Sequence, residues 1–470
     1  MSIGTVDLRA LGTRLADRAR AGRSEADVQS DIRTLLLAGG LDLNDDDLLV
    51  PQLEAPSGEQ RRIDIELGFT VIETKRSLLA AGARQKAEPQ LAGYLHQRQN
   101  ETGQRYVGIL TDGADWLLFF LASDGALREV SSFRLRTPEL DIDGLRIWLE
   151  GVLATAQVIS PSPLEIARRL GAQSPSHELD LAELEALWAS CRDRPSVQLK
   201  RQLWARLLTA ALGTKFEDED RLFIEHTYLV VTAELVAHAV VGFDVAAPSH
   251  SPAALLAGRL FGDAQIGGVV EEDFFDWIIE APHGPAFVRT LARRLARFDW
   301  GGVEHDVLKV LYESVIEARQ RHRLGEYYTP DWLAERVVAE AVTDPLAERV
   351  LDPACGSGTF VFHAVRRYLA AAEAQGISPG TAVVEAAQQI VGVDLHPVAV
   401  TLARVTFLLA LGTARLAEPD RGPFTVPIYL GDSLLWQHGD AVHPRRRNRI
   451  DDRRRRAISP RAALPGACAR

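Results

Sequence analysis

A glycine-rich segment in this 470-residue chain has the residue types of a ligand-binding turn. Residues 350–360 read Val-Leu-Asp-Pro-Ala-Cys-Gly-Ser-Gly-Thr-Phe, which predicts a buried strand, a tight turn and the start of a helix. Such a turn brings backbone N–H groups close to a ligand, at a helix end that favours negative charge. Gly356 and Gly358 lack the Cβ atoms that would block this approach. The segment by itself fits many nucleotides.

Two further apolar runs also end in carboxylates. Residues 389–394 end at Asp394, and residues 426–430 are followed by Gly-Asp, which places Asp432 at the end of a third strand. Because ligands bind at the C-terminal edge of an open parallel sheet, we expect Asp352, Asp394 and Asp432 to meet there. A carboxylate after the second strand can accept both hydrogen bonds of a ribose diol. The glycine turn has no third glycine in register, which argues against a nicotinamide enzyme.

These motifs and their order resemble those of the adenine-N6 DNA methyltransferases, most closely those of type I and type IIG restriction–modification systems. The resemblance covers roughly residues 300 to 436 and includes an upstream Tyr-Tyr-Thr-Pro motif at residues 327–330. It implies S-adenosylmethionine as the cofactor. The residues that it assigns to cofactor binding are Tyr328, Thr329, Pro330, Asp352, Ala354, Gly356, Gly358, Asp394 and Asp432.

The resemblance also implies a role for most of these residues. Asp352 and the backbone of the glycine turn would hold the amino-acid end of the cofactor. Asp394 would bind the ribose hydroxyls, and Asp432 would bind the adenine amino group. Tyr328 and Thr329 would close over the cofactor from the preceding helix.

One motif of this family, Asn-Pro-Pro-aromatic, is missing from the sequence. Its task is to accept both N–H hydrogens of the adenine amine while an aromatic ring stacks on the extruded base. Asparagine occurs only at Asn44, Asn100 and Asn448, and none of them precedes proline. Residues 437–470 are rich in arginine, and we interpret them as a disordered tail, C-terminally truncated or shifted in reading frame; a phosphate-binding tail is the alternative. We therefore expect part of a cofactor site without adenine methylation.

A second group of chemically capable residues lies near the N-terminus. Residues 63–67 and 69–75 predict two adjacent strands. Side chains alternate along a strand, so Glu73 and Lys75 face the same side, and Asp64 on the neighbouring strand can reach the same place. Mg²⁺ binds one or two carboxylates and keeps its waters, and a lysine can orient or deprotonate the attacking water.

This arrangement resembles the PD-(D/E)xK nucleases, with Asp64, Glu73 and Lys75 at the motif positions and the two carboxylates as Mg²⁺ ligands. The chain departs from the motif by having isoleucine before the aspartate. Gln90 and Tyr94 resemble the Q-x-x-x-Y element of type I restriction nucleases, and their i,i+4 spacing places them on one helix face.

Two more elements support this interpretation. Residues 24–37 predict a capped amphipathic helix, and its Glu25 is a possible extra metal ligand or helper. Residues 106–120 predict a hairpin that also matches the end of the nuclease family.

Bulk properties restrict the class of protein further. Three scattered cysteines exclude a disulfide scaffold and give no zinc pattern, so we expect a reducing cytoplasm. The apolar run 228–243 is interrupted by Glu234 and His238 and is too short and polar for a membrane span.

The net charge of −11 is compatible with DNA binding, since phosphates require only a local basic surface. By resemblance, the target-recognition domain or subunit lies outside this chain.

The predicted fold is multidomain α/β. It comprises a PD-(D/E)xK nuclease-like α/β domain (1–157), a linker (158–177), an all-helical connector (178–323), a partial Rossmann-like class I methyltransferase domain (324–436) and the tail (437–470).

The predicted function is site-specific adenine-N6 methylation of double-stranded DNA in a restriction–modification system, with a fused Mg²⁺-dependent endonuclease. Two alternatives stay open. One is a free-standing methyltransferase whose N-terminal domain binds DNA without cleaving it. The other is a truncated gene product that is not an enzyme.

Overall fold

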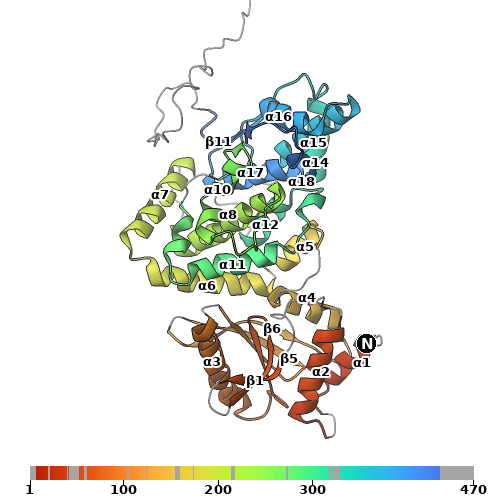
Figure 1. Cartoon of the computed structure of the whole chain (residues 1–470), viewed down its shortest axis with the longest axis vertical. Coiled ribbons are helices and arrows are strands. Elements are labelled where there is room, and N and C mark those ends of the chain that lie inside the picture. Colours follow the sequence, from red (N-terminus) through yellow and green to blue (C-terminus); the bar gives the residue numbers. More distant parts are fainter. Residues whose placement is uncertain are drawn as a thin grey trace, which may run out of the picture. The chain divides into compact units, whose positions relative to one another are not determined.

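The computed structural model gives a mixed α/β fold. It describes residues 7–19, 22–39, 41, 52–57, 61–102, 105–122, 124–153, 159–172, 174–212, 218–270, 274–316, 321 and 329–434. Residues Met1–Ser433 form one compact unit (Figure 1). Tyr328 and the predicted tail 437–470 lie outside the described residues.

The N-terminal segment is built on a six-stranded mixed sheet in the order β1-β2-β3-β4-β5-β6. Its strands are β1 (Gln52–Ser57), β2 (Arg61–Leu67), β3 (Thr70–Thr74), β4 (Val107–Thr111), β5 (Asp115–Leu121) and β6 (Leu127–Arg134). The pair β3 and β4 is parallel, and the other neighbours are antiparallel. The predicted strands and hairpin are confirmed as β2, β3, β4 and β5, whereas β1 and β6 were not predicted.

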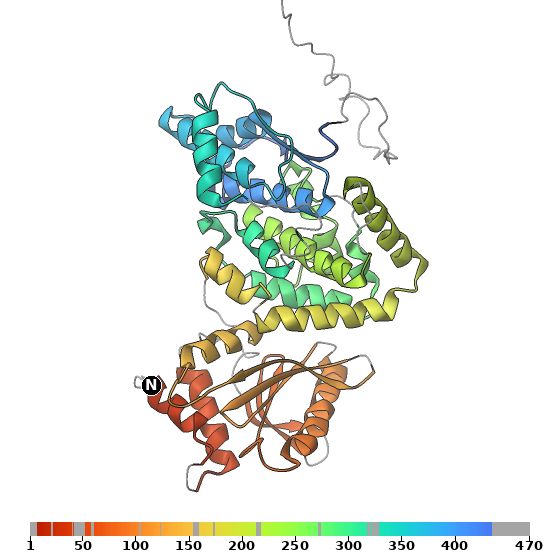
Figure 2. The same cartoon turned by 180° about the vertical axis from the view of Figure 1, so that it is seen from behind.

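Helices cover both faces of this sheet (Figure 2). They are α1 (Leu8–Ala16), α2 (Glu25–Ala38), α3 (Ala83–Thr102) and α4 (Ile142–Val152). On one face, Leu11 of α1 and Ile32 of α2 belong to the same apolar cluster as Ile72. On the other face, Leu91 of α3 clusters with Val71. Consecutive residues of β3 therefore point to opposite helical layers, as the period of a strand requires.

The middle of the chain is mostly helical. Its helices are α5 (Pro163–Arg169), α6 (Pro175–Cys191), α7 (Pro195–Leu212), α8 (Asp220–Val241), α9 (Pro252–Leu256), α10 (Arg259–Asp263), η2 (Asp276–Glu280), α11 (Gly284–Leu295), η3 (Trp300–Gly302) and α12 (Val307–Val315). Within the described residues, α8 is the one helix with the length and hydropathy of a membrane span, and 89% of its apolar window is buried in the fold. A helix that is apolar on all sides is expected at the centre of such a bundle.

Two details of the prediction for this region are wrong. The connector is not all-helical, because β7 (Ile266–Gly267) pairs in parallel with β10 (Phe424–Thr425). A two-residue strand is too short to show a periodicity, and its partner lies far along the chain. The predicted linker 158–177 contains α5, whose Ile166 is buried in the core. Two of its Ser-Pro pairs, at 162–163 and 174–175, begin helices instead of breaking the fold, since proline suits the first helical turn.

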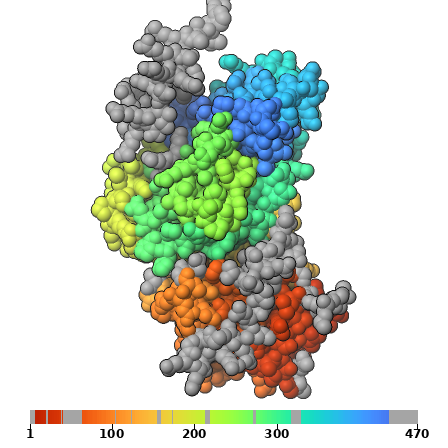
Figure 3. Space-filling view, in the orientation of Figure 1, coloured from red at the N-terminus to blue at the C-terminus, as the bar shows by residue number. Residues whose placement is uncertain are grey.

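The C-terminal segment contains a three-stranded parallel sheet in the order β11-β9-β8. Its elements are α14 (Asp331–Ala341), β8 (Val350–Asp352), α15 (Thr359–Ala374), α16 (Pro379–Gln389), β9 (Ile390–Asp394), α17 (Pro397–Leu411), α18 (Thr413–Leu416) and β11 (Ile428–Leu430). The three predicted strands are confirmed. Tyr228 of α8 and Phe407 of α17 share one apolar core, and the surfaces of the two segments are continuous in Figure 3. The helical segment therefore supports the sheet directly.

Candidate functional sites

The glycine turn connects β8 to α15 in a conformation that needs glycine. Gly356 and Gly358 have φ angles of 53° and 98°. Other residues rarely adopt these left-handed values. A Cβ on Gly358 would lie 3.1 Å from the Cα of Ala403, so its absence also lets α15 approach α17 closely.

Asp394, at the end of the central strand β9, holds this turn in place. Its Oδ2 accepts a hydrogen bond of 2.8 Å from the N–H of Gly356, and its Oδ1 accepts one of 2.8 Å from the N–H of His396. The N–H of Cys355 donates to the carbonyl of Val393 at 3.0 Å. The carboxylate predicted to bind ribose hydroxyls therefore already accepts two backbone hydrogen bonds, and its remaining lone pairs are those left for a ligand.

Asp352 brings an unused acceptor to this site. Its Oδ1 accepts from the N–H of Ala354 at 3.2 Å, whereas its Oδ2 is buried and has no hydrogen-bond partner. Burial, with a further contribution from the nearby Asp394 carboxylate, raises the pKa of Asp352. A buried acceptor without a donor is costly, so the site fits a ligand that donates hydrogen bonds, such as an ammonium group.

The remaining predicted cofactor residues are partly brought together. The N–H of Gly431 donates to the carbonyl of Asp394 at 2.9 Å, which places Asp432 directly after the same sheet edge. Pro330 is the N-cap residue of α14, and the carbonyl of Thr329 accepts a hydrogen bond from Lys309 Nζ. Burial raises the pKa of Cys355, in agreement with a structural thiol rather than a nucleophile.

One residue beneath the glycine turn was not predicted. Asp306 is 3% exposed and caps α12 by accepting from the N–H of Lys309 at 3.1 Å. It also accepts from Thr359 Oγ1 at 2.8 Å and from Thr406 Oγ1 at 3.4 Å. Burial raises the pKa of Asp306 to about 6, although these hydrogen bonds oppose the shift. An aspartate before a helical pattern was a visible cap signal, but nothing local connected it to the turn.

The N-terminal candidate site joins Glu73 and Lys75. The ammonium of Lys75 donates to Glu73 Oε1 at 2.6 Å and forms a longer ion pair with Glu25 Oε1 at 3.4 Å. Glu73 is fully buried, and its Oε2 has no hydrogen-bond partner. Burial and the nearby Asp64 raise the pKa of Glu73 to about 7. An unpaired buried carboxylate oxygen fits a bound cation.

Asp64 is positioned by its neighbours on β3 and α2. Its Oδ2 accepts from the N–H of Thr74 at 2.7 Å and from Thr74 Oγ1 at 2.8 Å. The side chain of Gln29 donates to the Asp64 carbonyl at 2.7 Å. The contact of Thr74 with this carboxylate was not predicted. Asp64 and Glu73 together provide two carboxylates, which matches the few protein ligands that Mg²⁺ needs.

Gln90 and Tyr94 lie on α3, which covers the Val71 face of β3. The side-chain amide of Gln90 donates to the hydroxyl of Tyr94 at 2.8 Å, and Tyr94 is 2% exposed. Glu73 lies two positions after Val71 and therefore projects from the same face. The described residues contain no group of three or more histidine, cysteine, aspartate or glutamate side chains arranged around a metal position.

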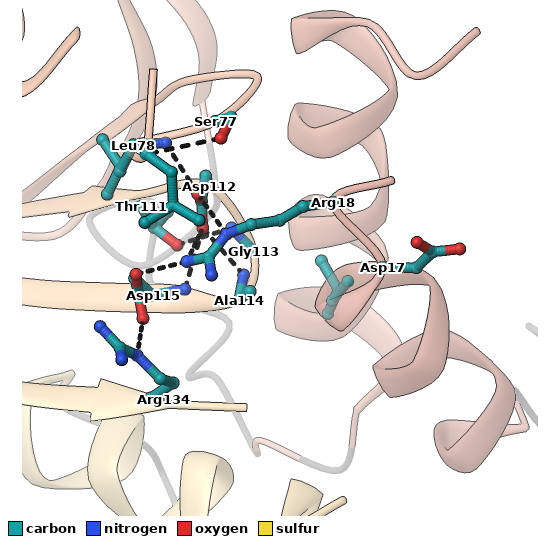
Figure 4. Close-up of polar contacts among 12 residues, drawn as sticks. Asp17, Arg18, Ser77, Leu78, Thr111, Asp112, Gly113, Ala114, Asp115 and Arg134 are labelled. Atoms are coloured by element: carbon teal, nitrogen blue, oxygen red, sulfur yellow. Dashed lines mark hydrogen bonds and ion pairs between the residues drawn. The ribbon is translucent and has the colours of Figure 1, made fainter. Parts of the chain in front are cut away.

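A buried ionic network fixes the end of β4 beside this site. The N–H of Lys75 donates to the carbonyl of Thr111, the residue before Asp112. Figure 4 shows Arg18 pointing to Asp112 and Asp115, and its Nε lies 2.8 Å from Asp112 Oδ2. The same oxygen accepts from the N–H of Leu78 at 2.8 Å, three residues after Lys75. Burial alone would raise the pKa of Asp112, but Arg18 and the backbone donors hold it below its ordinary value.

Comparison with known proteins identifies the class of the C-terminal region. Residues 303–416 match the N-6 DNA Methylase family, so this part of the chain is an N6-adenine DNA methyltransferase domain. The family implies the use of S-adenosylmethionine. The match covers the glycine turn, Asp394 and Asp306, whereas the N-terminal sheet lies outside it.

A particular relative agrees with this class. The chain is 27% identical over 210 residues to the adenine-specific methyltransferase PglX of Streptomyces coelicolor. The matched region covers 37% of this chain and 17% of that protein. The chain thus spans about a sixth of the length of this curated relative.

Two solved structures also resemble this chain, both with low TM-scores. The DrdV–DNA complex is similar over 91% of this chain and 40% of that chain, with 16% identity and a TM-score of 0.34. The type IIG restriction endonuclease BpuSI is similar over 86% and 42%, with 14% identity and a TM-score of 0.28.

Proposed function

We propose that this chain is the S-adenosylmethionine-binding and nuclease-bearing portion of a restriction–modification enzyme that acts on double-stranded DNA. The observation that carries the cofactor part is the buried Oδ2 of Asp352, which has no donor in a site otherwise made of glycine-turn backbone and carboxylates. An S-adenosylmethionine ammonium would satisfy it. The bound cofactor would supply an electrophilic methyl group.

The other residues of this proposal have the roles that the family resemblance implies. The backbone of Gly356 and Gly358 would face the cofactor carboxylate near the start of α15, where a helix N-terminus favours negative charge. Asp394 would bind the ribose hydroxyls and Asp432 the adenine amine. Thr329, Pro330 and Ala354 would line the site. Tyr328 belongs to the same proposal, although it lies outside the described residues.

Cofactor binding and methyl transfer are separable in this proposal. The 470 residues contain no Asn-Pro pair, so the side-chain amide that would accept the adenine amine is absent from this sequence. We therefore expect S-adenosylmethionine to bind without methylation of DNA adenine by this chain alone. Transfer of radioactive methyl groups to DNA by the purified chain would contradict that expectation.

The nuclease part of the proposal rests on Glu73. Its unpaired, buried Oε2 lies in a group with Asp64 and Lys75, which fits a Mg²⁺ ion held by two carboxylates and water. A bound Mg²⁺ would stabilise negative charge on a phosphate. Lys75, held by Glu73 and Glu25, would orient the attacking water or accept its proton. Gln90 and Tyr94 would support this face from α3.

Calorimetric titration of the full chain with S-adenosylmethionine tests the cofactor part directly. Wild-type protein is expected to bind, and Asp352→Ala is expected to weaken binding at least tenfold because it removes a buried carboxylate oxygen that has no donor of its own and could accept from the ammonium. Glu373→Ala, at an exposed position of the same segment, is the control and is expected to bind normally. Equal affinity of wild type and Asp352→Ala would overturn the assignment.

A further inference from the structure

Helix α12 contacts both motifs of the proposed cofactor site. Lys309 donates to the carbonyl of Thr329, which belongs to the Tyr-Thr-Pro motif. Asp306, three residues earlier, accepts a hydrogen bond of 2.8 Å from Thr359, the first residue of α15 after the glycine turn. Two neighbouring side chains of one helix therefore hold segments that are separated by β8 and α14.

The contacts of Asp306 suit a fixed support rather than a ligand group. The carboxylate is 3% exposed, and each of its oxygens accepts from the protein: Oδ1 from Lys309 N–H at 3.1 Å and Oδ2 from Thr359 at 2.8 Å. Thr406 of α17 adds a longer contact of 3.4 Å to Oδ1. Three elements around the glycine turn thus converge on one buried acceptor.

We propose that Asp306 is a positioning residue for cofactor binding, which sets the glycine turn through its hydrogen bond with Thr359. This inference rests on the proposed function. Asp394 fixes the turn from the strand side, at Gly356, and Asp306 fixes it from the helix side. With both anchors in place, the N–H groups at the start of α15 keep the orientation that an anionic group of the ligand needs.

The test uses a matched pair of variants in the full chain. Thr359→Val keeps the size of the side chain but cannot donate to Asp306, whereas Thr359→Ser keeps the hydroxyl. Affinity for S-adenosylhomocysteine is measured by calorimetry, and amide hydrogen exchange is measured over residues 355–362. We expect Thr359→Val to bind about tenfold more weakly, the loss typical of one hydrogen bond to a charged acceptor. Thr359→Ser is expected to stay within about twofold of wild type, because it restores this hydrogen bond.

The exchange measurement separates this inference from the proposed function. Faster exchange at 355–362 in Thr359→Val, with exchange of the N-terminal sheet unchanged and Thr359→Ser like wild type, supports the positioning role. If wild type binds no S-adenosylhomocysteine, the cofactor proposal fails, and the exchange result alone decides the role of Asp306. The positioning role is overturned if residues 355–362 of Thr359→Val exchange as slowly as those of the wild type. It is also overturned if the wild type binds S-adenosylhomocysteine and Thr359→Val binds it with the same affinity.

If Thr359→Val does not fold, a second variant, Asp306→Asn, tests the same inference. Asp306→Asn keeps the side-chain size and one acceptor oxygen but removes the charge that strengthens both hydrogen bonds. Faster exchange confined to residues 355–362 in Asp306→Asn supports the inference. Unchanged exchange at these residues contradicts it.

Discussion

The carboxylate of Asp394 accepts the N–H of Gly356 at 2.8 Å, so the end of the central strand β9 fixes the turn that follows the edge strand β8. The second oxygen of Asp394 accepts from His396, at the start of α17. A single side chain thus determines the position of two loops at the C-terminal edge of the sheet. Its proposed role in ribose binding and its structural role are therefore coupled.

Replacing Asp394 by asparagine tests this coupling. The amide can accept at only one of the two positions, so one backbone N–H loses its acceptor. We expect the free energy of unfolding to fall by about 1–3 kcal/mol and S-adenosylmethionine binding to weaken at least tenfold. Urea unfolding and calorimetry measure the two effects. Asp420→Asn is the control, since Asp420 is exposed and accepts from Ser378 at the surface. Normal stability and binding of Asp394→Asn would contradict the coupling.

Substitution by alanine should destabilise the chain more at Gly358 than at Gly376, another glycine with positive φ. Gly358 and Gly376 both have positive φ, at 98° and 73°, so alanine costs about 1–2 kcal/mol at either position. Only at Gly358 would the new Cβ meet a helix, 3.1 Å from the Cα of Ala403, because nothing lies within 4 Å at Gly376. We expect Gly358→Ala to lose more stability in urea unfolding than Gly376→Ala. Equal losses would show that α15 and α17 are not in close contact.

Glu73→Gln is expected to abolish Mg²⁺-dependent DNA cleavage by the full chain. The substitution keeps the shape of the side chain and removes the charge that would bind the cation, so nicking of supercoiled plasmid should fall at least a hundredfold. The fold should be retained, because burial already disfavours the charge of Glu73. EDTA should have the same effect on wild type.

The matched control for this experiment is Glu66→Gln on the same sheet. Glu66 is also buried, but it pairs with Arg98 at 2.7 Å and with Tyr106. This variant is expected to cleave like wild type, even where its stability is lower. If Glu73→Gln cleaves normally, the N-terminal domain is not a nuclease of the proposed kind, and a DNA-binding role without cleavage is favoured.

Local sequence patterns predicted the main elements but not the contacts between them. The strands ending at Asp352 and Asp394 are apolar runs closed by a carboxylate, and the predicted helix 24–37 is capped by Ser24, in a capping box with Asp27. The half-exposed edge strand β6 shows little apolar alternation and was missed.

Contacts that depend on the tertiary fold have no local signal. The hydrogen bond from Thr359 to Asp306 joins residues 53 positions apart. The contact from Thr74 to Asp64 joins two strands and likewise has no signal in the sequence of either strand. Sequence reasoning therefore placed the carboxylates at their strand ends but could not find the residues that hold them in position.

Asp306 should make the stability of the chain depend on pH in a defined direction. Burial raises its pKa from 3.8 to about 6 in the folded protein. Between these values the folded chain binds a proton at Asp306 that the unfolded chain has released, so the contribution of Asp306 to stability is greatest at low pH and falls as pH rises through this window. The charge of Lys309 lowers the pKa of Asp306 and that of Asp331 raises it. Both charges are present in wild type and in Asp306→Asn.

The comparison of wild type with Asp306→Asn isolates this contribution, because all other titrating groups are shared. We expect the free energy of unfolding of wild type, relative to Asp306→Asn, to fall by up to about 3 kcal/mol between pH 4 and pH 7. Urea unfolding at intervals of pH gives the difference directly. A difference that stays constant over this range, or that grows with pH, would mean that the carboxylate is better solvated or better paired than its burial beneath the glycine turn implies.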